Sequence, residues 1–203
     1  MNSVLHSVLL DWHGQHLEER IASELAAAYS EPHRRYHTTQ HIDSCLRELA
    51  RFESHVVHLN DVRWALLFHD AIYDPRRNDN EARSADWACG VMQELQRPED
   101  EIARVRKLIM ATVHATQAAT ADEALLLDID LSILGADEAT FDEYDRAIRV
   151  EYEWVPEQAY KFARASVLQS FLQRERIFQT AVFQDREAIA RGNLERVLER
   201  LRG

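Results

Sequence analysis

Apolar residues recur three and four positions apart along most of this chain, which is the spacing of one face of an α-helix. Aromatic and β-branched residues rarely alternate with polar residues at every second position, so no strand is predicted. The first helical run covers about residues 3–29, with Gly14 as a candidate bend or break. The later helices are expected over about residues 39–49, 62–71, 80–92, 98–113, 124–134, 141–152, 160–172 and 185–201.

A few residues mark where these helices begin and end. Thr38 or Thr39 is a candidate N-cap of the second helix, because a side-chain hydroxyl can accept a hydrogen bond from a backbone N–H of the first turn. Asp61 is expected to cap the helix that follows it in the same way. Gly135 is a candidate C-terminal stop, and Gly192 is a candidate interruption of the last helix.

The composition favours a few long helices. Among 203 residues there are only five glycines and four prolines, which leaves little material for tight turns. Apolar residues make up 46% of the chain, and a chain of this length buries about 70% of its unfolded surface as one domain. We therefore expect an all-α, single-domain helical bundle over residues 1–203. Its core would comprise about residues 35–135, with C-terminal helices over residues 137–202 packed on it.

The charge excludes one class of partner. The formal net charge is −11, so stable binding to a nucleic-acid backbone is not expected. A small anionic substrate is compatible with this charge, because a bound metal can dominate the local field. Cys45 and Cys89 lack metal-motif spacing and are expected to be reduced, buried thiols. Neither a signal sequence nor a stretch of transmembrane length is recognisable, so we expect a cytoplasmic protein without a membrane partner.

His69 and Asp70 stand at the end of an apolar helical stripe. His69 follows Val62, Ala65 and Leu66 at helical spacing, so its side chain is expected to point inward. A hydrogen-bonded core histidine is one interpretation, and a metal ligand is the other. Asp70 favours the ligand, because a carboxylate at a helix C-terminus is destabilised by the helix dipole unless a cation compensates it.

Asp130 raises the same question. A carboxylate surrounded by large apolar residues is costly without a partner, and a metal ion is one such partner. The neighbours of Asp130 at helical spacing are Leu126, Leu127, Ile133 and Leu134. Asp128 sits on a less apolar face and is either a second candidate ligand or a helix cap. Asp130 is the favoured ligand.

His37 and His41 are four residues apart and therefore share one face of a helix. The residues between them are polar, so a solvated pair is the alternative interpretation. Their combination with His69, Asp70 and Asp130 favours a metal site built from three separate helices. Imidazole and carboxylate groups are ordinary ligands of divalent ions.

This order, His…His-Asp…Asp over about residues 35–135, resembles that of the HD superfamily of metal-dependent phosphohydrolases. The resemblance implies an HD-type helical bundle with His41, His69, Asp70 and Asp130 as metal ligands. The run Tyr36-His37-Thr38-Thr39-Gln40-His41 is similar to the Tyr-His-Asn-x-x-His signature of cyclic nucleotide phosphodiesterases. In that signature the first histidine protonates the leaving group, which makes His37 the candidate general acid. Asp130-Leu131-Ser132 likewise matches the Asp-Leu-Ser around the last metal ligand of those enzymes.

Cyclic nucleotide specificity does not carry over from this similarity. Thr38 replaces the signature asparagine, and Ala71-Ile72-Tyr73 stands where His-Pro-Gly would follow the His-Asp pair. Together the motifs look like those of a bacterial group of predicted HD phosphohydrolases of about this length. That resemblance implies a fold and a metal but supplies no substrate.

Other polar residues are candidates for the same site. Glu81 either orients a metal-bound water or a ligand histidine, or is an ordinary acid in a first helical turn. Arg76 and Arg77 either meet a substrate phosphate or belong to a solvated loop. His114 is a candidate supporting residue, substrate contact or extra ligand. Three residues of the C-terminal helices are candidates for an anion clamp, namely Arg149, Tyr152 and Arg164.

Together these features predict a phosphohydrolase that acts on a nucleotide or another small phosphorylated metabolite. Hydroxide on the metal would attack phosphorus while His37 protonates the departing oxygen. Mixed nitrogen and oxygen ligands suit Mn²⁺, Fe²⁺, Co²⁺, Ni²⁺ or Zn²⁺, and Asp70 could bridge to a second ion such as Mg²⁺. Two alternatives stay open. One is a di-iron oxygenase of the HD fold, with His114 as the extra ligand. The other is a metal-stabilised binding or regulatory module without turnover.

Overall fold

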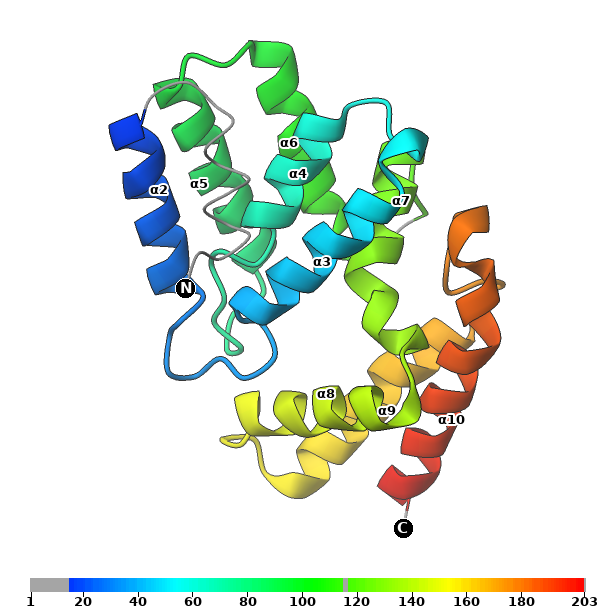
Figure 1. Cartoon of the computed structure of the whole chain (residues 1–203). Helices are drawn as coiled ribbons and strands as arrows, with labels where there is room; N and C mark the ends of the chain where they lie inside the picture. The colour runs from blue at the N-terminus through cyan, green and yellow to red at the C-terminus, as the bar shows by residue number, and fades with distance from the viewer. Residues whose placement is uncertain (1–14, 115–116, 203) are drawn as a thin grey trace.

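Every regular element is helical in residues 15–114 and 117–202, which are the residues that the computed structural model describes (Figure 1). The all-α prediction is confirmed for these residues, whereas residues 3–14 of the first predicted helix lie outside them. Short 3₁₀ segments are η1 (Glu53–His55), η2 (Leu131–Gly135) and η3 (Ala181–Arg186). The nine α-helices in this part of the chain are α2 (Gln15–Ala28), α3 (Thr39–Arg51), α4 (Leu59–Phe68), α5 (Asn80–Glu94), α6 (Glu99–Ala111), α7 (Ala121–Asp130), α8 (Glu138–Glu151), α9 (Glu157–Leu172) and α10 (Glu187–Arg202).

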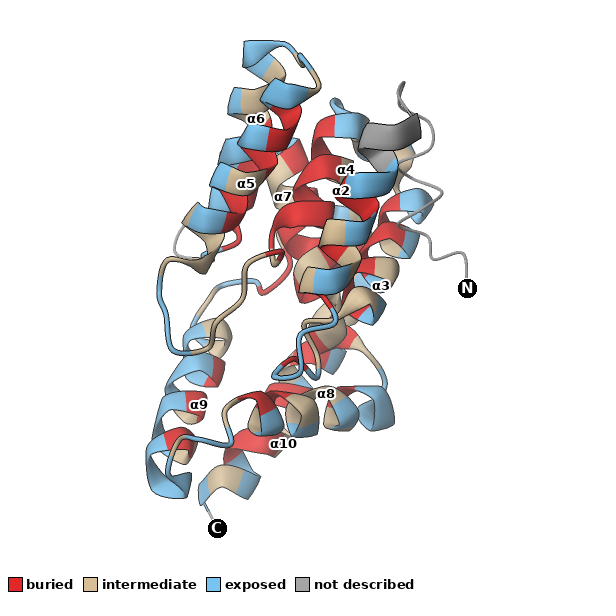
Figure 2. Ribbon diagram, turned by 90° about the vertical axis from the view of Figure 1, so that its left-hand side faces the viewer, coloured by how far each residue is buried: buried red, intermediate tan, exposed pale blue. Residues whose placement is uncertain are grey.

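The central element is α4, which packs against α3, α5, α6 and α7. Val62 and residues 64–68 have no exposed surface, and Figure 2 shows how buried residues concentrate on this helix. The Trp64 and Phe68 rings stack with centroids 5.4 Å apart, and Trp87 of α5 meets Phe68 edge-on at 5.6 Å. This apolar surround fixes the axis of α4, and so the position of the residues that follow its last turn.

The helices α8, α9 and α10 form the other end of the molecule, below α3 and α7 in Figure 1. The helix α10 packs against η2, η3 and α9. The Asn193 side chain donates hydrogen bonds of 2.9 Å to the carbonyls of Leu134 and Ala136. One hydrophobic core extends from Ile21 in α2 to Leu198 in α10, which joins the two ends. Among the described helices, none is long and apolar enough to cross a bilayer.

Two predicted helix starts have different outcomes. Thr38 is the N-cap of α3, and its hydroxyl accepts a hydrogen bond from the N–H of Gln40. The prediction for Asp61 is wrong, because α4 begins at Leu59 and Asp61 lies within its first turn. Asp61 is buried and pairs with Arg104 of α6. A buried carboxylate is stabilised more by a guanidinium partner than by local capping.

Other boundaries also differ from the predicted pattern. The helix α6 ends at Ala111, short of residue 113, and α7 begins at Ala121 and changes to 3₁₀ geometry after Asp130. The helix α10 continues through Gly192, so the predicted interruption is wrong. Packing of α10 on η2 and α9 outweighs the weak helix propensity of one glycine. Both cysteines are free and buried, as expected.

Alanine substitutions at Gly135 and Gly192 should change the stability of the protein in opposite directions. A Cβ on Gly135 would lie 2.7 Å from Cβ of Arg186 and 3.2 Å from its carbonyl oxygen. Gly135→Ala should therefore destabilise the protein by about 1–3 kcal/mol through overpacking. A Cβ on Gly192 would meet no described atom within 4 Å. Gly192→Ala is the matched control and should stabilise the protein by about 0.5–1 kcal/mol. Urea denaturation measures both, and equal effects would contradict the close packing at Gly135.

Candidate metal centre

The ends of three helices bring four predicted residues together. His41 lies in the first turn of α3, just after its N-cap Thr38. His69 follows the last residue of α4, and Asp70 comes next. Asp130 is the last residue of α7. Packed helices fix each of these backbones, so the side chains meet in a defined space at the junction of α3, α4 and α7.

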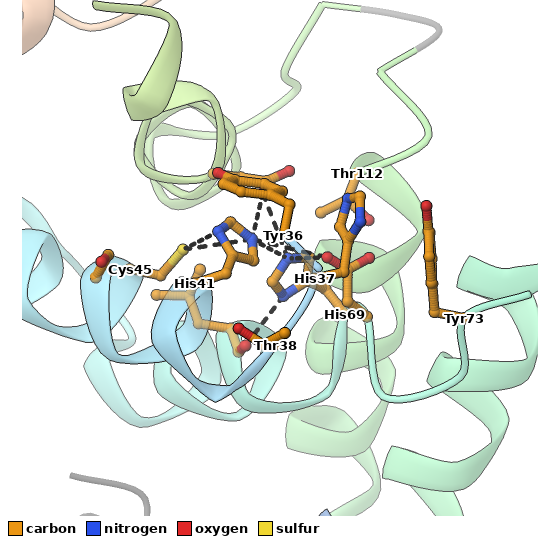
Figure 3. A network of polar contacts seen from close by, with 12 residues as sticks. Tyr36, His37, Thr38, His41, Cys45, His69, Tyr73 and Thr112 are labelled. Atoms are coloured by element: carbon orange, nitrogen blue, oxygen red, sulfur yellow. Dashed lines mark hydrogen bonds and ion pairs between the residues drawn. The ribbon is translucent and has the colours of Figure 1, made fainter. Parts of the chain in front are cut away.

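His41, His69 and Asp130 form a compact group, and Figure 3 shows the two imidazole rings close together. The Nε2 atoms of the two histidines are 3.2 Å apart. Oδ1 of Asp130 lies 3.2 Å from Nε2 of His41 and 3.3 Å from Nε2 of His69. Oδ2 of Asp70 is 3.1 Å from Nε2 of His69 and 3.7 Å from Nε2 of His41. Both histidines are buried, and the two carboxylates retain some exposure.

These spacings fit a divalent ion. Ligand atoms about 2.0–2.2 Å from a metal lie roughly 2.9–3.5 Å from one another in tetrahedral or octahedral sites. Nδ1 of His69 is 3.0 Å from the carbonyl oxygen of Leu66, so with Nδ1 protonated the lone pair of Nε2 points into the group. His41, His69 and Asp130 could therefore hold a metal ion, with Asp70 beside them.

The charges in the group favour a cation. Burial raises the pKa of Asp130, but the charge of His69 and hydrogen bonds from three histidines lower it well below its usual value. Burial also raises the pKa of Asp70, but the charge of His69 outweighs this effect, and the pKa lies below its usual value. Burial lowers the pKa of His69, yet the charges of the two carboxylates raise it well above normal. Positive charge is thus stabilised here, either as a proton or as a metal ion that displaces it.

Asp128, the alternative ligand, faces away from this group. It has no exposed surface, and its carboxylate accepts hydrogen bonds of 2.7 Å from the backbone N–H groups of Gln179 and Thr180. The Thr180 hydroxyl donates to it as well. Nor does Asp128 cap its own helix, whose N-cap is Thr120. Asp128 instead fixes the segment that leads into η3, while Asp130 lies in the group.

Glu151 of α8 holds His37 beside the candidate metal centre. Nδ1 of His37 is 2.7 Å from Oε2 of Glu151, which also accepts a 2.8 Å hydrogen bond from the Tyr73 hydroxyl. Oε1 accepts the backbone N–H groups of residues 35–37 at 2.7–3.1 Å. The His37 ring packs on Tyr73 with centroids 4.2 Å apart and lies 6.1 Å from the His41 ring (Figure 3). His37 therefore adjoins the compact group from a fixed orientation.

The surroundings of His37 and Glu151 shift both pKa values toward the charged forms. Burial would raise the pKa of Glu151, but the hydrogen bond and charge of His37, with the backbone N–H donors, lower it to about 2. Burial lowers the pKa of His37, and the charges of Asp70 and Glu151 raise it above its usual value. A protonated imidazole can donate through both nitrogens, and one of them already faces Glu151.

Glu151 was missed at the level of sequence, although a signal for it was present. A carboxylate whose neighbours at helical spacing are all apolar needs a partner, as argued for Asp130. The neighbours of Glu151 at that spacing are Ala147, Ile148, Trp154 and Val155. What the pattern lacks is the identity of the partner, because His37 lies more than a hundred residues earlier.

Of the remaining candidates, His114 reaches the group. Its Nε2 lies 2.9 Å from Oδ2 of Asp130. Its backbone adopts the left-handed conformation, with φ of 56°, which costs a residue other than glycine about 1–2 kcal/mol. The carbonyl of His114 accepts a hydrogen bond from Arg174, which helps to hold this conformation. Glu81 lies in the first turn of α5.

The candidate arginines already have partners. Arg76 stacks over Trp154 at 5.0 Å, and Arg77 forms an ion pair with Asp79. Arg164 forms an ion pair of 2.9 Å with Asp145. Arg149 donates to the carbonyl of Tyr152 at 2.7 Å and lies over the ring of Tyr160. Arg149, Tyr152 and Arg164 thus stabilise the C-terminal helices, and their role toward a substrate stays a prediction.

Comparisons with known proteins add no family assignment. The chain matches no protein-family model, no curated protein and no solved structure at a significant level.

Substitution of Asp128 should lower stability without affecting metal binding, whereas substitution of Asp130 should abolish metal binding. Asp128→Asn leaves buried donors around Thr180 with fewer acceptors and should cost about 1–3 kcal/mol, while metal still raises the melting temperature. Asp130→Asn should abolish that metal-dependent rise, because binding with [metal] at 100 times Kd adds about 2.7 kcal/mol only where the site is intact. Calorimetric melting with and without metal, plus elemental analysis, measures both effects. Metal retained by Asp130→Asn but lost from Asp128→Asn would reverse the assignment.

Glu151→Gln should lower the free energy of unfolding at neutral pH. The pKa of Glu151 is about 2 in the folded protein against an ordinary 4.5. The carboxylate therefore stabilises the fold above pH 4.5, and this contribution is lost as the pH falls toward 2. The variant should lose roughly 3 kcal/mol at pH 7 and show a shallower acid limb in denaturant titrations. Glu143→Gln, an exposed change on the same helix, is the control and should change stability by less than about 0.5 kcal/mol. Parallel acid limbs in wild type and Glu151→Gln would contradict this account.

Proposed function

We propose that this protein is a metal-dependent phosphohydrolase of the HD superfamily that acts on a small phosphate ester, such as a nucleotide. The proposal rests on the meeting of His41, His69, Asp70 and Asp130 at three helix ends, with His37 oriented beside them. Their order along the chain is the His…His-Asp…Asp order of that superfamily.

The metal would be held by Nε2 of His41 and His69 and by the carboxylates of Asp70 and Asp130. When bound, the ion lowers the pKa of water and polarises a phosphoryl oxygen. A set of two imidazoles and two carboxylates suits Mn²⁺, Fe²⁺, Co²⁺, Ni²⁺ or Zn²⁺. Asp70 is offset toward His69 and is 20% exposed, so it could also share a second ion such as Mg²⁺.

His37 would supply the proton for the leaving group. Its Nδ1–H is directed to Glu151, so the proton on Nε2 is the one available to the departing oxygen. Glu151 acts through His37, because it fixes the ring and favours its protonated form. Tyr73 packs on the same ring and shares the Glu151 carboxylate, which restricts rotation of His37 further. Glu151 and Tyr73 are thus positioning residues.

One observation favours a second candidate function. Nε2 of His114 lies 2.9 Å from Oδ2 of Asp130, whereas Oδ1 is the atom of that carboxylate that pairs with His41 and His69. A second iron held there by Asp130 and His114 would be compatible with an oxygenase of the same fold. Oxygen consumption by the iron-loaded protein distinguishes this function from hydrolysis.

The proposed function predicts metal-dependent release of phosphate or of a nucleoside from a panel of nucleotides and generic phosphate esters. His37→Ala should lower kcat by about 10²–10⁴-fold at unchanged metal content, because a positioned general acid contributes that much. The loss should be smaller for a p-nitrophenyl ester, whose leaving group needs less protonation. Steady-state kinetics after reconstitution with Mn²⁺, Co²⁺, Ni²⁺ or Mg²⁺ measures these effects.

His55→Ala is the matched control, since His55 is exposed in η1 and should leave kcat unchanged. Metal loss from His37→Ala in parallel with activity would make His37 a ligand or a structural support. Tight binding of a nucleotide without turnover across the panel would reject hydrolysis in favour of a regulatory module.

A further inference from the structure

A cavity of about 720 Å³ lies behind Tyr73, outside the candidate metal centre. We call it the Trp154 pocket. Its walls come from the loop before α3, the loop after α4, the first half of α5 and the C-terminal end of α8. None of the four candidate metal ligands lines it. A volume of this size is typical of small-molecule sites, which range over about 300–1,000 Å³.

Tyr73 forms the wall between the pocket and the metal centre. One neighbour of its ring is His37, at 4.2 Å between centroids, and another is His33, nearly parallel at 6.1 Å. Only His33 of these two lines the pocket, and its Nε2 is 2.7 Å from the carbonyl of Tyr73. Glu151 also belongs to the wall, and its carboxylate is occupied by His37 and Tyr73. The pocket is therefore a compartment distinct from the metal centre.

The pocket offers an aromatic surface. Trp154 is 46% exposed, which is unusual for so large an apolar side chain. The guanidinium of Arg76 already lies 5.0 Å from the Trp154 ring centre, so a planar cation occupies one position beside this ring. Trp87 contributes a second, partly buried indole to the lining. A flat ring can stack on such a surface at little cost in side-chain entropy.

Two of the guanidinium groups that line the pocket have no carboxylate partner among the described residues. Arg76 and Arg83 line the pocket, and neither forms an ion pair with a carboxylate in the described part of the chain, whereas the guanidinium of Arg35 donates to the carbonyls of Pro32 and Arg34. Glu31 pairs with Arg34 instead. Of the other lining acids, Asp74 and Glu151 accept hydrogen bonds from neighbouring groups, and Glu153 is exposed. Guanidinium groups bind phosphate or carboxylate in bidentate fashion, so Arg76 and Arg83 are the groups of the pocket that can hold an anion.

We propose that the Trp154 pocket is a second ligand site, which binds a small anionic molecule with a flat aromatic ring, such as a nucleoside monophosphate. The ring stacks on Trp154, and the anion is held by the guanidinium groups of Arg76 and Arg83. The site does not depend on the proposed hydrolytic function, because its residues are separate from the metal ligands.

The test uses AMP as the probe and isothermal titration calorimetry as the measurement. Wild type and Asp130→Asn should bind AMP at the pocket equally well, because the pocket does not require the metal centre. Trp154→Ala and Arg83→Gln should each weaken AMP binding at least tenfold. Phe162→Ala and Arg51→Gln remove an exposed aromatic ring and an exposed cation elsewhere, and both should leave binding unchanged. Arg83 is exposed, so its variant keeps the test sound even if Trp154→Ala unfolds.

Two fragments of AMP test the contributions of the aromatic ring and of the phosphate separately. Adenosine and inorganic phosphate should each bind at least tenfold more weakly than AMP, because each makes only part of the contacts. Inorganic phosphate that binds as tightly as AMP would remove the role of the aromatic ring and overturn the proposal. So would absence of saturable AMP binding, or AMP binding that Asp130→Asn abolishes and Trp154→Ala leaves intact. None of these results depends on whether the protein hydrolyses phosphate esters.

Discussion

The need to neutralise carboxylates held at helix C-termini determines how the centre of this molecule is assembled. Asp70 and Asp130 stand at the ends of α4 and α7, where the helix dipole and partial burial both act against a negative charge. His41 of α3 and His69 at the end of α4 both lie within about 3–4 Å of the two carboxylates, and His114 also pairs with Asp130. The ends of α3, α4 and α7 therefore require one another, and packing around α4 holds them in place.

The same principle operates a second time at Glu151. A carboxylate with no exposed side-chain surface would be prohibitive alone, and here it accepts hydrogen bonds from three backbone N–H groups, an imidazole and a phenol. This network connects the end of α8 to the loop before α3. The carboxylate that orients the candidate proton donor His37 thus comes from the C-terminal helices, whereas His37 and the candidate metal ligands belong to the N-terminal part of the chain.

Sequence patterns were sufficient for the residues whose burial is set by their own helix. Asp130 and His69 could be recognised as inward-facing from apolar neighbours three and four residues away, and the structure brings both into one group. Partners could not be recognised in this way, since they depend on tertiary contacts. Asp61 has the position of a cap in the sequence, yet Arg104 of another helix determines its role.

Asp128 illustrates the same limit of sequence patterns. The pattern left it open as a ligand or a cap of its own helix, because the loop at residues 179–180 that it binds is distant in sequence. The ends of helices were also harder to predict than their middles. Local propensity has little influence on where a helix ends. Side-chain hydrogen bonds, such as the one that the Thr112 hydroxyl donates to the carbonyl of Ile109, have more influence.

The division between the two sides of the centre has a consequence for partial unfolding. The four candidate ligands all precede residue 131, whereas the carboxylate that orients His37 belongs to α8. Local opening of proteins occurs in cooperative units with different free energies. If α8 detaches before the N-terminal helices melt, the protein keeps its candidate ligand group but loses the orientation of His37. Heating would then produce an intermediate in which His41, His69 and Asp130 still lie together while His37 has lost its partner, and hydrogen exchange in α8 would report when it forms.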